Sequence, residues 1–291
     1  MPYAKVNDIN LYYEVHGQGE PFLFISGTGS SCEYMKVVTV DWFSRDFQLI
    51  IFDHRGTGRS DKPDMPYSTR MFANDAVGLL EHLGIERAHV GGRSMGGRVS
   101  QWVAIDHPYR VGALVLSSTG AGSWENENIT FEPQRGVPYD TALRLIELGH
   151  AGYMQEHRES SFMFTPGFVA AHPEVVNRFH ELDSAYPTPL NCYLRHVIAR
   201  QCHETRHLLH RITAPTLVID GRDDTDGGGT GNHVESSRDL ARNIRGAELV
   251  LVPGAHNYLM EHPENHQVVI DFLKRHPLEQ SSSRARELVA S

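Results

Sequence analysis

The chain has 291 residues, of which 40% are hydrophobic and 22% charged, so it can bury the core of one large domain or of two small ones. Its 27 Lys and Arg against 36 Asp and Glu give a formal net charge of −9, which argues against non-specific nucleic-acid binding. No apolar run approaches the ~20 residues that span a bilayer, and no basic segment followed by an apolar one opens the chain. Three scattered cysteines, Cys32, Cys192 and Cys202, favour a reducing compartment. We therefore expect a cytoplasmic protein that binds neither nucleic acid nor membranes, and these features predict no particular oligomeric state.

Short apolar runs alternate with helical patterns along most of the chain. Residues 9–15 partly alternate, which indicates a half-buried antiparallel strand near a sheet edge. A continuous apolar run predicts a buried strand at residues 22–25, and short, mostly apolar runs predict further strands at residues 47–52, 87–91, 111–116, 215–220 and 247–252. Apolar residues at helical spacing predict helices at residues 33–43, 69–83, 97–105, 234–244 and 264–275, although β-branched residues weaken the first. The alternation predicts an α/β fold with a mostly parallel sheet covered by helices on both faces.

The strand–helix alternation stops between about Gly120 and Leu209. This segment is rich in aromatic residues, histidines and prolines, with short helical patterns at residues 139–148 and 189–199. We interpret residues 120–209 as a helical lid inserted into a core that comprises residues 1–119 and 210–276. The polar residues 277–291 are expected to form a frayed tail.

A serine lies at the turn between one predicted strand and the helix that follows it. In Gly92-Arg93-Ser94-Met95-Gly96, glycines stand two residues either side of Ser94, which is the pattern of a nucleophile elbow. Such a serine has a strained backbone, and its neighbours lack a Cβ so that strand and helix can pack closely. The alternative is a glycine-rich turn whose serine merely caps the helix.

A serine hydroxyl is a weak nucleophile near neutral pH, so it needs a base, and the base needs an acid to orient it. His256 follows the last predicted strand, and Asp223 and Asp224 follow the strand before it. All three therefore lie at the carboxyl edge of a parallel sheet, where Ser94 also lies. The order Ser…Asp…His is that of hydrolases with this elbow, and either aspartate could serve as the acid.

With these motifs the chain resembles the α/β-hydrolases, in particular the lid-bearing serine esterases, lactonases and C–C hydrolases. The resemblance covers nearly all of the chain outside the lid. It is carried by the elbow, by His256 and by residues 53–60 (DHRGTGRS), 221–224 (GRDD) and 261–264 (EHPE). It implies Ser94 as nucleophile, His256 as base and Asp224 as orienting acid, since the family's acid stands three residues after the glycine of this motif.

Backbone N–H groups of Thr28 and Met95 are expected to form the oxyanion hole. The family usually has histidine-glycine after this strand, where the present chain has Ser26-Gly27. The N–H donors do not depend on that side chain, so we expect function to survive with altered support of the loop. Arg93 could meet a substrate carboxylate or, alternatively, pair with a neighbouring acid.

Substrate contacts are expected from Gly27, Arg93, Phe162 and Tyr193. Aromatic and sulfur side chains of the insertion are candidate pocket walls, although packing between lid and core explains them equally well: Trp124, Phe162, Met163, Phe164, Phe168 and Tyr193.

Residues 203–207 (HETRH) match the zinc-protease pattern of two histidines one helical turn apart. The segment runs within a few residues into the next strand, which leaves little helix, and no third ligand follows at usable spacing. We therefore expect lid or linker histidines on a solvated face. The glycine-rich residues 227–231 lack the lysine of a phosphate-binding loop. Asp53, with Arg55 and Ser60, is expected to brace its own turn.

A nucleophilic serine forms an acyl-enzyme, which suits esters, lactones, thioesters and activated amides. Dehalogenases and epoxide hydrolases of the fold carry aspartate at the position of Ser94. We therefore expect a hydrolase of a small carboxylic ester or lactone that needs no metal and no cofactor. The alternatives are C–C bond hydrolysis or acyl transfer on the same residues and, outside catalysis, a receptor that traps a small signal molecule.

Overall fold

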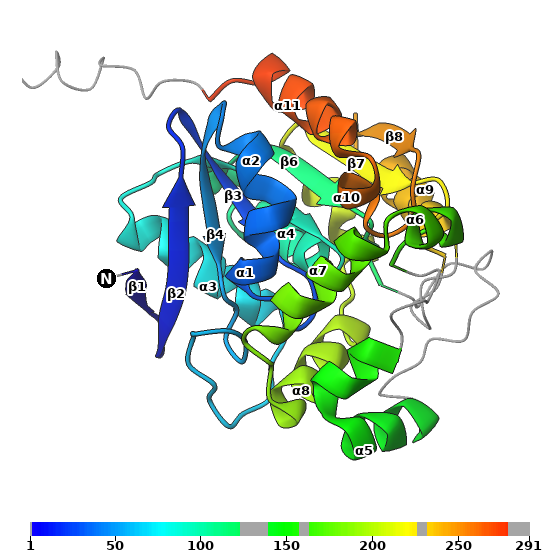
Figure 1. The fold of residues 1–291 in the computed structure, drawn as a ribbon. Coiled ribbons are helices and arrows are strands. Elements are labelled where there is room, and N and C mark those ends of the chain that lie inside the picture. Colours follow the sequence, from blue (N-terminus) through cyan, green and yellow to red (C-terminus); the bar gives the residue numbers. More distant parts are fainter. Residues whose placement is uncertain (1, 123–138, 157–162, 226–231, 279–291) are drawn as a thin grey trace, which may run out of the picture.

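The computed structural model describes residues 2–122, 139–156, 163–225 and 232–278 (Figure 1). Its strands are β1 (Tyr3–Val6), β2 (Ile9–His16), β3 (Glu20–Ile25), β4 (Phe47–Phe52), β5 (Ala88–Arg93), β6 (Val111–Ser117), β7 (Thr216–Gly221) and β8 (Glu248–Val252). Its α-helices are α1 (Cys32–Met35), α2 (Asp41–Phe43), α3 (Thr69–His82), α4 (Met95–Asp106), α5 (Tyr139–Glu156), α6 (Pro166–Ala171), α7 (Pro173–Ser184), α8 (Leu190–Gln201), α9 (His233–Asn243), α10 (Tyr258–Glu261) and α11 (His266–Arg275). A π-helical stretch, η1 (Lys36–Val40), joins α1 to α2, and 3₁₀ turns lie at η2 (Pro108–Arg110), η4 (Arg206–Arg211) and η5 (Pro263–Asn265).

The described strands form one sheet of eight in the order β1-β2-β4-β3-β5-β6-β7-β8. Strands β3 to β8 run parallel to one another, and β2 pairs antiparallel with both β1 and β4. The predicted α/β fold and its mostly parallel sheet are thus confirmed, including an antiparallel strand near one edge. The sequence analysis missed the outermost strand, β1, because four residues with only Ala4 and Val6 turned inward carry too short a pattern.

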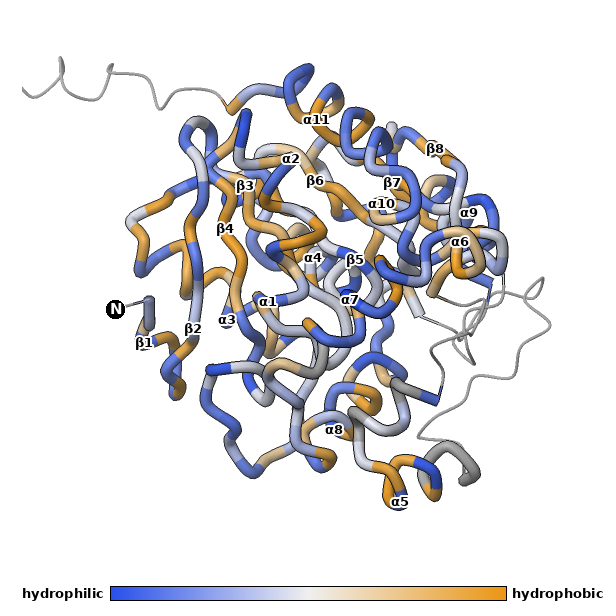
Figure 2. The backbone as a smooth tube through the Cα atoms, in the orientation of Figure 1, coloured by the Kyte–Doolittle hydropathy of each residue, from blue (hydrophilic) through white to orange (hydrophobic). Residues whose placement is uncertain are grey.

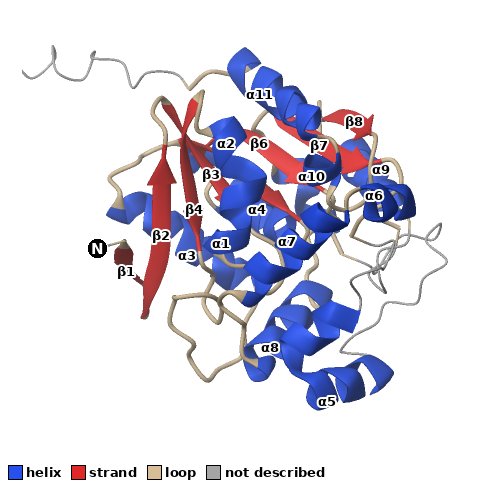
Figure 3. Ribbon diagram, in the orientation of Figure 1, coloured by secondary structure: helices blue, strands red, loops and turns tan. Residues whose placement is uncertain are grey.

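Helices cover both faces of the sheet (Figure 3). Successive side chains of a strand point to opposite faces, so Leu23 and Ile25 of β3 belong to the core cluster shared with α3, α4 and α9, whereas Phe22 and Phe24 belong to the one shared with α1, α2 and α11. Strands covered on both faces need apolar residues on both sides, and in Figure 2 β3, β4 and β6 are hydrophobic along most of their length. None of the described helices is long and apolar enough to cross a membrane.

The predicted helix at residues 33–43 is helical throughout but irregular. Val37, Val38 and Val40 crowd the preceding turn, and the segment widens into η1, where the hydroxyl of Thr39 donates to the carbonyl of Met35 across 2.6 Å. The β-branched residues that weakened the prediction of a helix therefore lie in a π-helical stretch inside it.

Helices α5 to α8 lie between β6 and β7 in the chain. The sequence analysis predicted the start of α5 and most of α8 but missed α6 and α7, although Pro166 and Pro173 stand at their first positions, where proline is common. Helix α7 packs on the core through Phe179, whose ring centre lies 5.1 Å from that of Tyr34. The division into core, lid and tail stays a prediction, and residues 279–291 of the tail lie outside the described residues.

Candidate active site

Ser94 stands alone between β5 and α4 in a backbone conformation that residues with a side chain rarely adopt, with φ 56° and ψ −122°. Its N–H donates to the carbonyl of Ser117 across 2.9 Å, and its own carbonyl accepts the hydroxyl of Thr119 at 2.7 Å. The end of β6 and the residues just after it thus hold both the N–H and the carbonyl of Ser94. The serine side chain itself is partly exposed.

The flanking glycines are needed for this turn. A Cβ on Gly96 would lie 2.0 Å from the carbonyl oxygen of Ile25, and a Cβ on Gly92 would lie 2.3 Å from the carbonyl oxygen of Gly96. Both distances are too short for any side chain, so α4 can approach β3 and β5 closely only because these positions are glycine. The spacing that the sequence showed therefore has a steric cause.

The predicted oxyanion residues flank this turn. Met95 is the first residue of α4, and the N–H groups of a helix's first turn have no partner within the helix. Gly27, just before Thr28, lies against the serine, since a Cβ on it would be 3.4 Å from Ser94 Cβ and 3.9 Å from Ser94 Oγ. The loop after β3 is therefore beside the hydroxyl.

Asp224 and His256 meet at the carboxyl edge of the sheet, after β7 and β8. Nδ1 of His256 lies 2.7 Å from Oδ2 of Asp224, and both side chains are buried. Asp223 is exposed and accepts the N–H of Gly254 at 3.3 Å, so of the two candidate acids Asp224 is the one bonded to the histidine. Glu261 of the EHPE motif supports the same loop by accepting the N–H of Ala255 at 2.8 Å.

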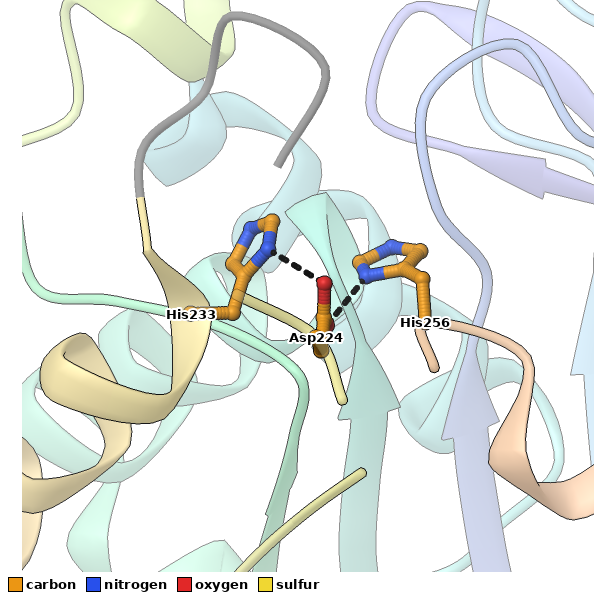
Figure 4. Close-up of side chains that lie close together, drawn as sticks. All are labelled: Asp224, His233 and His256. Atoms are coloured by element: carbon orange, nitrogen blue, oxygen red, sulfur yellow. Dashed lines mark hydrogen bonds and ion pairs between the residues drawn. The ribbon is translucent and has the colours of Figure 1, made fainter. Parts of the chain in front are cut away.

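The sequence analysis missed a third member of this cluster, His233, the first residue of α9. Its Nδ1 lies 3.2 Å from Oδ1 of Asp224, and its ring centre lies 4.8 Å from that of His256 (Figure 4). Among 18 histidines it carried no motif. Its place at the start of the helix that follows the acid's loop was the only available signal.

The charges of the cluster follow from burial and pairing. Burial alone would raise the pKa of the Asp224 carboxyl, but the two imidazoles outweigh burial and lower it. Burial lowers the pKa of His256 to about 4, against the opposing effect of Asp224. At neutral pH the acid is therefore ionised and His256 is neutral.

A second buried acid lies behind the first. Asp220, in β7, accepts the hydroxyls of Ser118 and Ser237, each at 2.7 Å. Burial, followed by the charge of Asp224, raises the pKa of Asp220 well above its usual range. The sequence pattern indicates this residue only as the end of a predicted strand.

The expected substrate-binding residues are placed as follows. Arg93 is buried and, within the described part of the chain, forms no ion pair; its Nη1 donates to the carbonyl of His256. Among the described residues the guanidinium contacts a carbonyl and, 5.2 Å away, the Tyr34 ring; pairing with an acid stays a prediction. Tyr193 lies half-buried on α8. Phe162, Trp124 and the glycine-rich residues 227–231 lie outside the described residues.

Two of the other candidate wall residues serve packing. Phe164 is fully buried between Phe168 and Phe179, with ring centres 5.5 and 5.4 Å away. The carbonyl of Met163 accepts the N–H of Asn257 at 2.9 Å, next to His256.

Residues 203–207 (HETRH), which match the zinc-protease pattern, do not form a helix that presents two histidines. His203 precedes the 3₁₀ turn η4, and the hydroxyls of Thr69 and Thr205 lie 2.9 and 3.0 Å from its two ring nitrogens. Our expectation of a solvated face is wrong for His203, which is 1% exposed because it fills the junction between α3 and the insertion; His207 is exposed.

Asp53 braces its loop as expected. Its carboxylate accepts the N–H groups of Cys32 and Arg59 at 2.6 and 2.7 Å, and its carbonyl accepts the Ser60 hydroxyl at 2.6 Å. Arg55 binds the buried Asp75 through Nε and Nη2.

Within the described residues, the metal-ligand types gather at one place, where single ligand atoms of Asp224, His233 and His256 all lie within 4.8 Å of one another. Both carboxylate oxygens already accept hydrogen bonds from the rings, so hydrogen bonding accounts for the cluster.

Comparison with known proteins gives the same family along most of the chain. The family model described as "alpha/beta hydrolase fold" matches residues 20–263. RutD of Variovorax paradoxus, named as a candidate carbamate hydrolase, is 30% identical over 274 residues, which cover 91% of this chain and 96% of RutD. The 3-oxoadipate enol-lactonase 2 of Acinetobacter baylyi is 29% identical over 265 residues, 90% of this chain and 92% of the lactonase.

A solved structure is similar to this chain over nearly its whole length. The enol-lactonase of Burkholderia xenovorans superposes with a TM-score of 0.77 at 25% identity, covering 94% of this chain and 100% of the lactonase. The order of strands, the strained serine turn and the family match lead to one conclusion: this chain is a member of the α/β-hydrolase fold family.

Proposed function

We propose that the protein is a serine hydrolase that cleaves a small carboxylic ester or lactone through an acyl-enzyme. The observation that carries the proposal is the strained Ser94 on the same sheet edge as a buried Asp224–His256 pair joined across 2.7 Å. A base next to an orienting acid, at the same sheet edge as a partly exposed serine, is the arrangement that acyl transfer requires.

The tautomer of His256 makes it a base toward the serine. An ionised carboxylate only accepts hydrogen bonds, so Nδ1 of His256 must carry the proton that it shares with Asp224. The neutral ring then has an unprotonated Nε2. Nε2 takes the proton from Ser94 Oγ as the oxygen attacks the carbonyl carbon, and Asp224 stabilises the resulting imidazolium.

The attack converts the carbonyl oxygen into an oxyanion, which the N–H groups of Thr28 and Met95 stabilise. The carbon–oxygen bond to the leaving alcohol then breaks, and His256 returns its proton to that oxygen. Water enters, loses a proton to His256 and attacks the acyl carbon, which releases the acid and restores the Ser94 hydroxyl. Every step uses side chains and N–H groups of the chain.

Two considerations support the substrate class. Oxygen leaving groups need less assistance than amide nitrogen, and a lactone is an ester closed into a ring. Relatives named as enol-lactonases, 25% and 29% identical over at least nine-tenths of this chain, support the lactone. The similarity to RutD makes a carbamate the second candidate, since the same acyl chemistry cleaves it. We propose residues 120–209 as the cover that selects among these substrates.

The experiment is a panel of p-nitrophenyl esters, lactones, p-nitrophenyl carbamates and a vinylogous diketone, assayed with the wild type and Ser94→Ala. We expect turnover of esters or lactones and a loss of at least ~10³-fold in kcat in the folded variant. Turnover that Ser94→Ala retains would refute the proposal. Covalent labelling of Ser94 by a fluorophosphonate without turnover of any substrate would favour a receptor.

A further inference from the structure

The carboxylate of Asp224 has two imidazole partners, one for each oxygen. Nδ1 of His256 lies 2.7 Å from Oδ2, and Nδ1 of His233 lies 3.2 Å from Oδ1. The side chains are 2%, 0% and 5% exposed for His256, Asp224 and His233 respectively. In Figure 4 the two rings approach the carboxylate from opposite sides, each with a nitrogen directed at it.

The backbone around His233 is anchored to the loop of the acid. The N–H of Val234 donates to the main-chain carbonyl of Asp224 at 3.4 Å. The side chain of Asn232 caps α9 by accepting the N–H of Glu235 at 3.0 Å. The ring therefore extends from the capped first turn of a helix, which limits its freedom to move away from Asp224.

Two hydrogen-bond donors fix the orientation of a carboxylate, whereas a single donor leaves it free to rotate. The terminal torsion of an aspartate is broad, so a carboxylate held at one oxygen can still rotate about its last bond. A second N–H on the other oxygen fixes the plane of the group and so the direction in which Oδ2 faces His256. Since an ionised carboxylate only accepts, His233 is the donor in this bond.

Other charged groups surround the pair of histidines and bear on the same carboxylate. Asp220 lies behind Asp224, and Arg93 reaches the main chain of His256. Burial opposes ionisation of Asp224, and the two imidazoles together outweigh it. His233 thus contributes to keeping the acid ionised as well as oriented.

We propose that His233 is a positioning residue for the reaction: its Nδ1–H holds Oδ1 of Asp224, so that Oδ2 orients His256 toward Ser94. This inference rests on the function proposed above. It predicts that loss of the donor affects the chemical step and leaves substrate binding almost unchanged.

The test compares His233→Leu, which removes the donor, with His233→Asn, whose amide N–H can replace it. Glu235→Gln, two residues along α9 on a different face of the helix and outside the cluster, is the control. We expect His233→Leu to lower kcat by about 10- to 100-fold with KM within about threefold, and His233→Asn to regain most of the loss. An unchanged kcat in folded His233→Leu, or an equal loss in both variants, overturns the inference. If Ser94→Ala retains activity, the proposed function fails instead, so the two failures are distinguishable.

If His233→Leu does not fold, proton NMR of the wild type and of His233→Asn tests the same hydrogen bond directly. The spectrum should contain two low-field signals from Nδ1–H protons bound to the carboxylate, of which His233→Asn removes one. A single low-field signal in the wild type overturns the inference. The inference is also overturned if dialysis against a chelator abolishes activity and added zinc restores it, because the three side chains would then hold an ion.

Discussion

The guanidinium of Arg93 donates a hydrogen bond to the main-chain carbonyl of His256 across 3.2 Å. Arg93 is the last residue of β5, directly before Ser94, so this bond joins the nucleophile turn to the loop of the histidine. The same guanidinium lies 5.2 Å from the ring centre of Tyr34, whose hydroxyl donates to Asn257 at 2.9 Å. Residues beside the nucleophile thus hold the base's loop in place.

Arg93→Met should lower kcat by about tenfold and change KM little, because it removes a hydrogen bond from a charged donor while keeping most of the side-chain volume. Steady-state kinetics on a neutral p-nitrophenyl ester measure both constants. A different result would favour our other reading of Arg93 as a substrate contact: KM would rise for substrates that carry a carboxylate, and kcat on neutral esters would be unchanged.

Ser94→Gly should raise the free energy of unfolding by about 1 kcal/mol relative to Ser94→Ala, since glycine removes the Cβ that makes φ 56° unfavourable. Both variants lack the hydroxyl, so their difference isolates backbone strain. Urea unfolding followed by circular dichroism measures it. A glycine variant less stable than the alanine variant would show that the turn stores no strain.

Gly27→Ala should fold normally and lose activity selectively. The new methyl would lie 3.9 Å from Ser94 Oγ, an ordinary contact distance that nevertheless narrows the space above the hydroxyl. We expect kcat/KM to fall more for esters with branched acyl groups than for acetates. Equal losses for all acyl groups would contradict a steric effect.

Gly96→Ala, the matched change on the other side of the turn, should instead destabilise the fold. Its Cβ would lie 2.0 Å from the carbonyl of Ile25, and overpacking of this kind costs about 1–3 kcal/mol or more. Thermal unfolding should show a lower midpoint than for Gly27→Ala. A reversed order of the two midpoints would contradict this placement of the glycines.

Stability should fall as the pH falls from about 6.5 toward 4. Burial lowers the pKa of His54 to about 3 and those of His196 and His256 to about 4. Between these values and 6.5 the unfolded chain binds protons that the folded chain does not. Each such histidine therefore removes up to about 1.4 kcal/mol of stability per unit of falling pH.

Urea unfolding at pH 7 and pH 5 measures this dependence. His196→Gln should flatten the slope by about one histidine's share, whereas the same change at the exposed His207 should leave it as in the wild type. An unchanged slope in folded His196→Gln would show that His196 binds a proton in the folded protein as it does in the unfolded chain.

The sequence predicted those parts of the fold whose periodicity is long and regular. The strand at Phe47–Phe52 was predicted with its observed bounds, because a run buried on both faces reads as continuously apolar. The helices α6 and α7 were missed because α6 has only 6 residues and α7 is rich in polar residues, so both give weak patterns; the packing of α7 through Phe179 is a tertiary contact.

Some residues of the candidate site could likewise be predicted from the sequence and others could not. Ser94, His256 and an acid at position 223 or 224 could be placed at one sheet edge, because each follows a strand and parallel topology implies the edge; the choice of Asp224 came from the family resemblance. His233 could not, since its closeness to Asp224 arises from how α9 starts after the intervening loop. The role of Arg93 was also out of reach, because its partner is a main-chain carbonyl 163 residues along the chain.

The most direct measurement of the central claim is the rate of fluorophosphonate labelling, with the site mapped by mass spectrometry in wild type and His256→Ala. A serine activated by His256 predicts one phosphonyl group per chain on the peptide that contains Ser94, formed at least ~10³-fold more slowly in the variant. Equal labelling rates in the two proteins, or a label on another residue while esters are still hydrolysed, would contradict it.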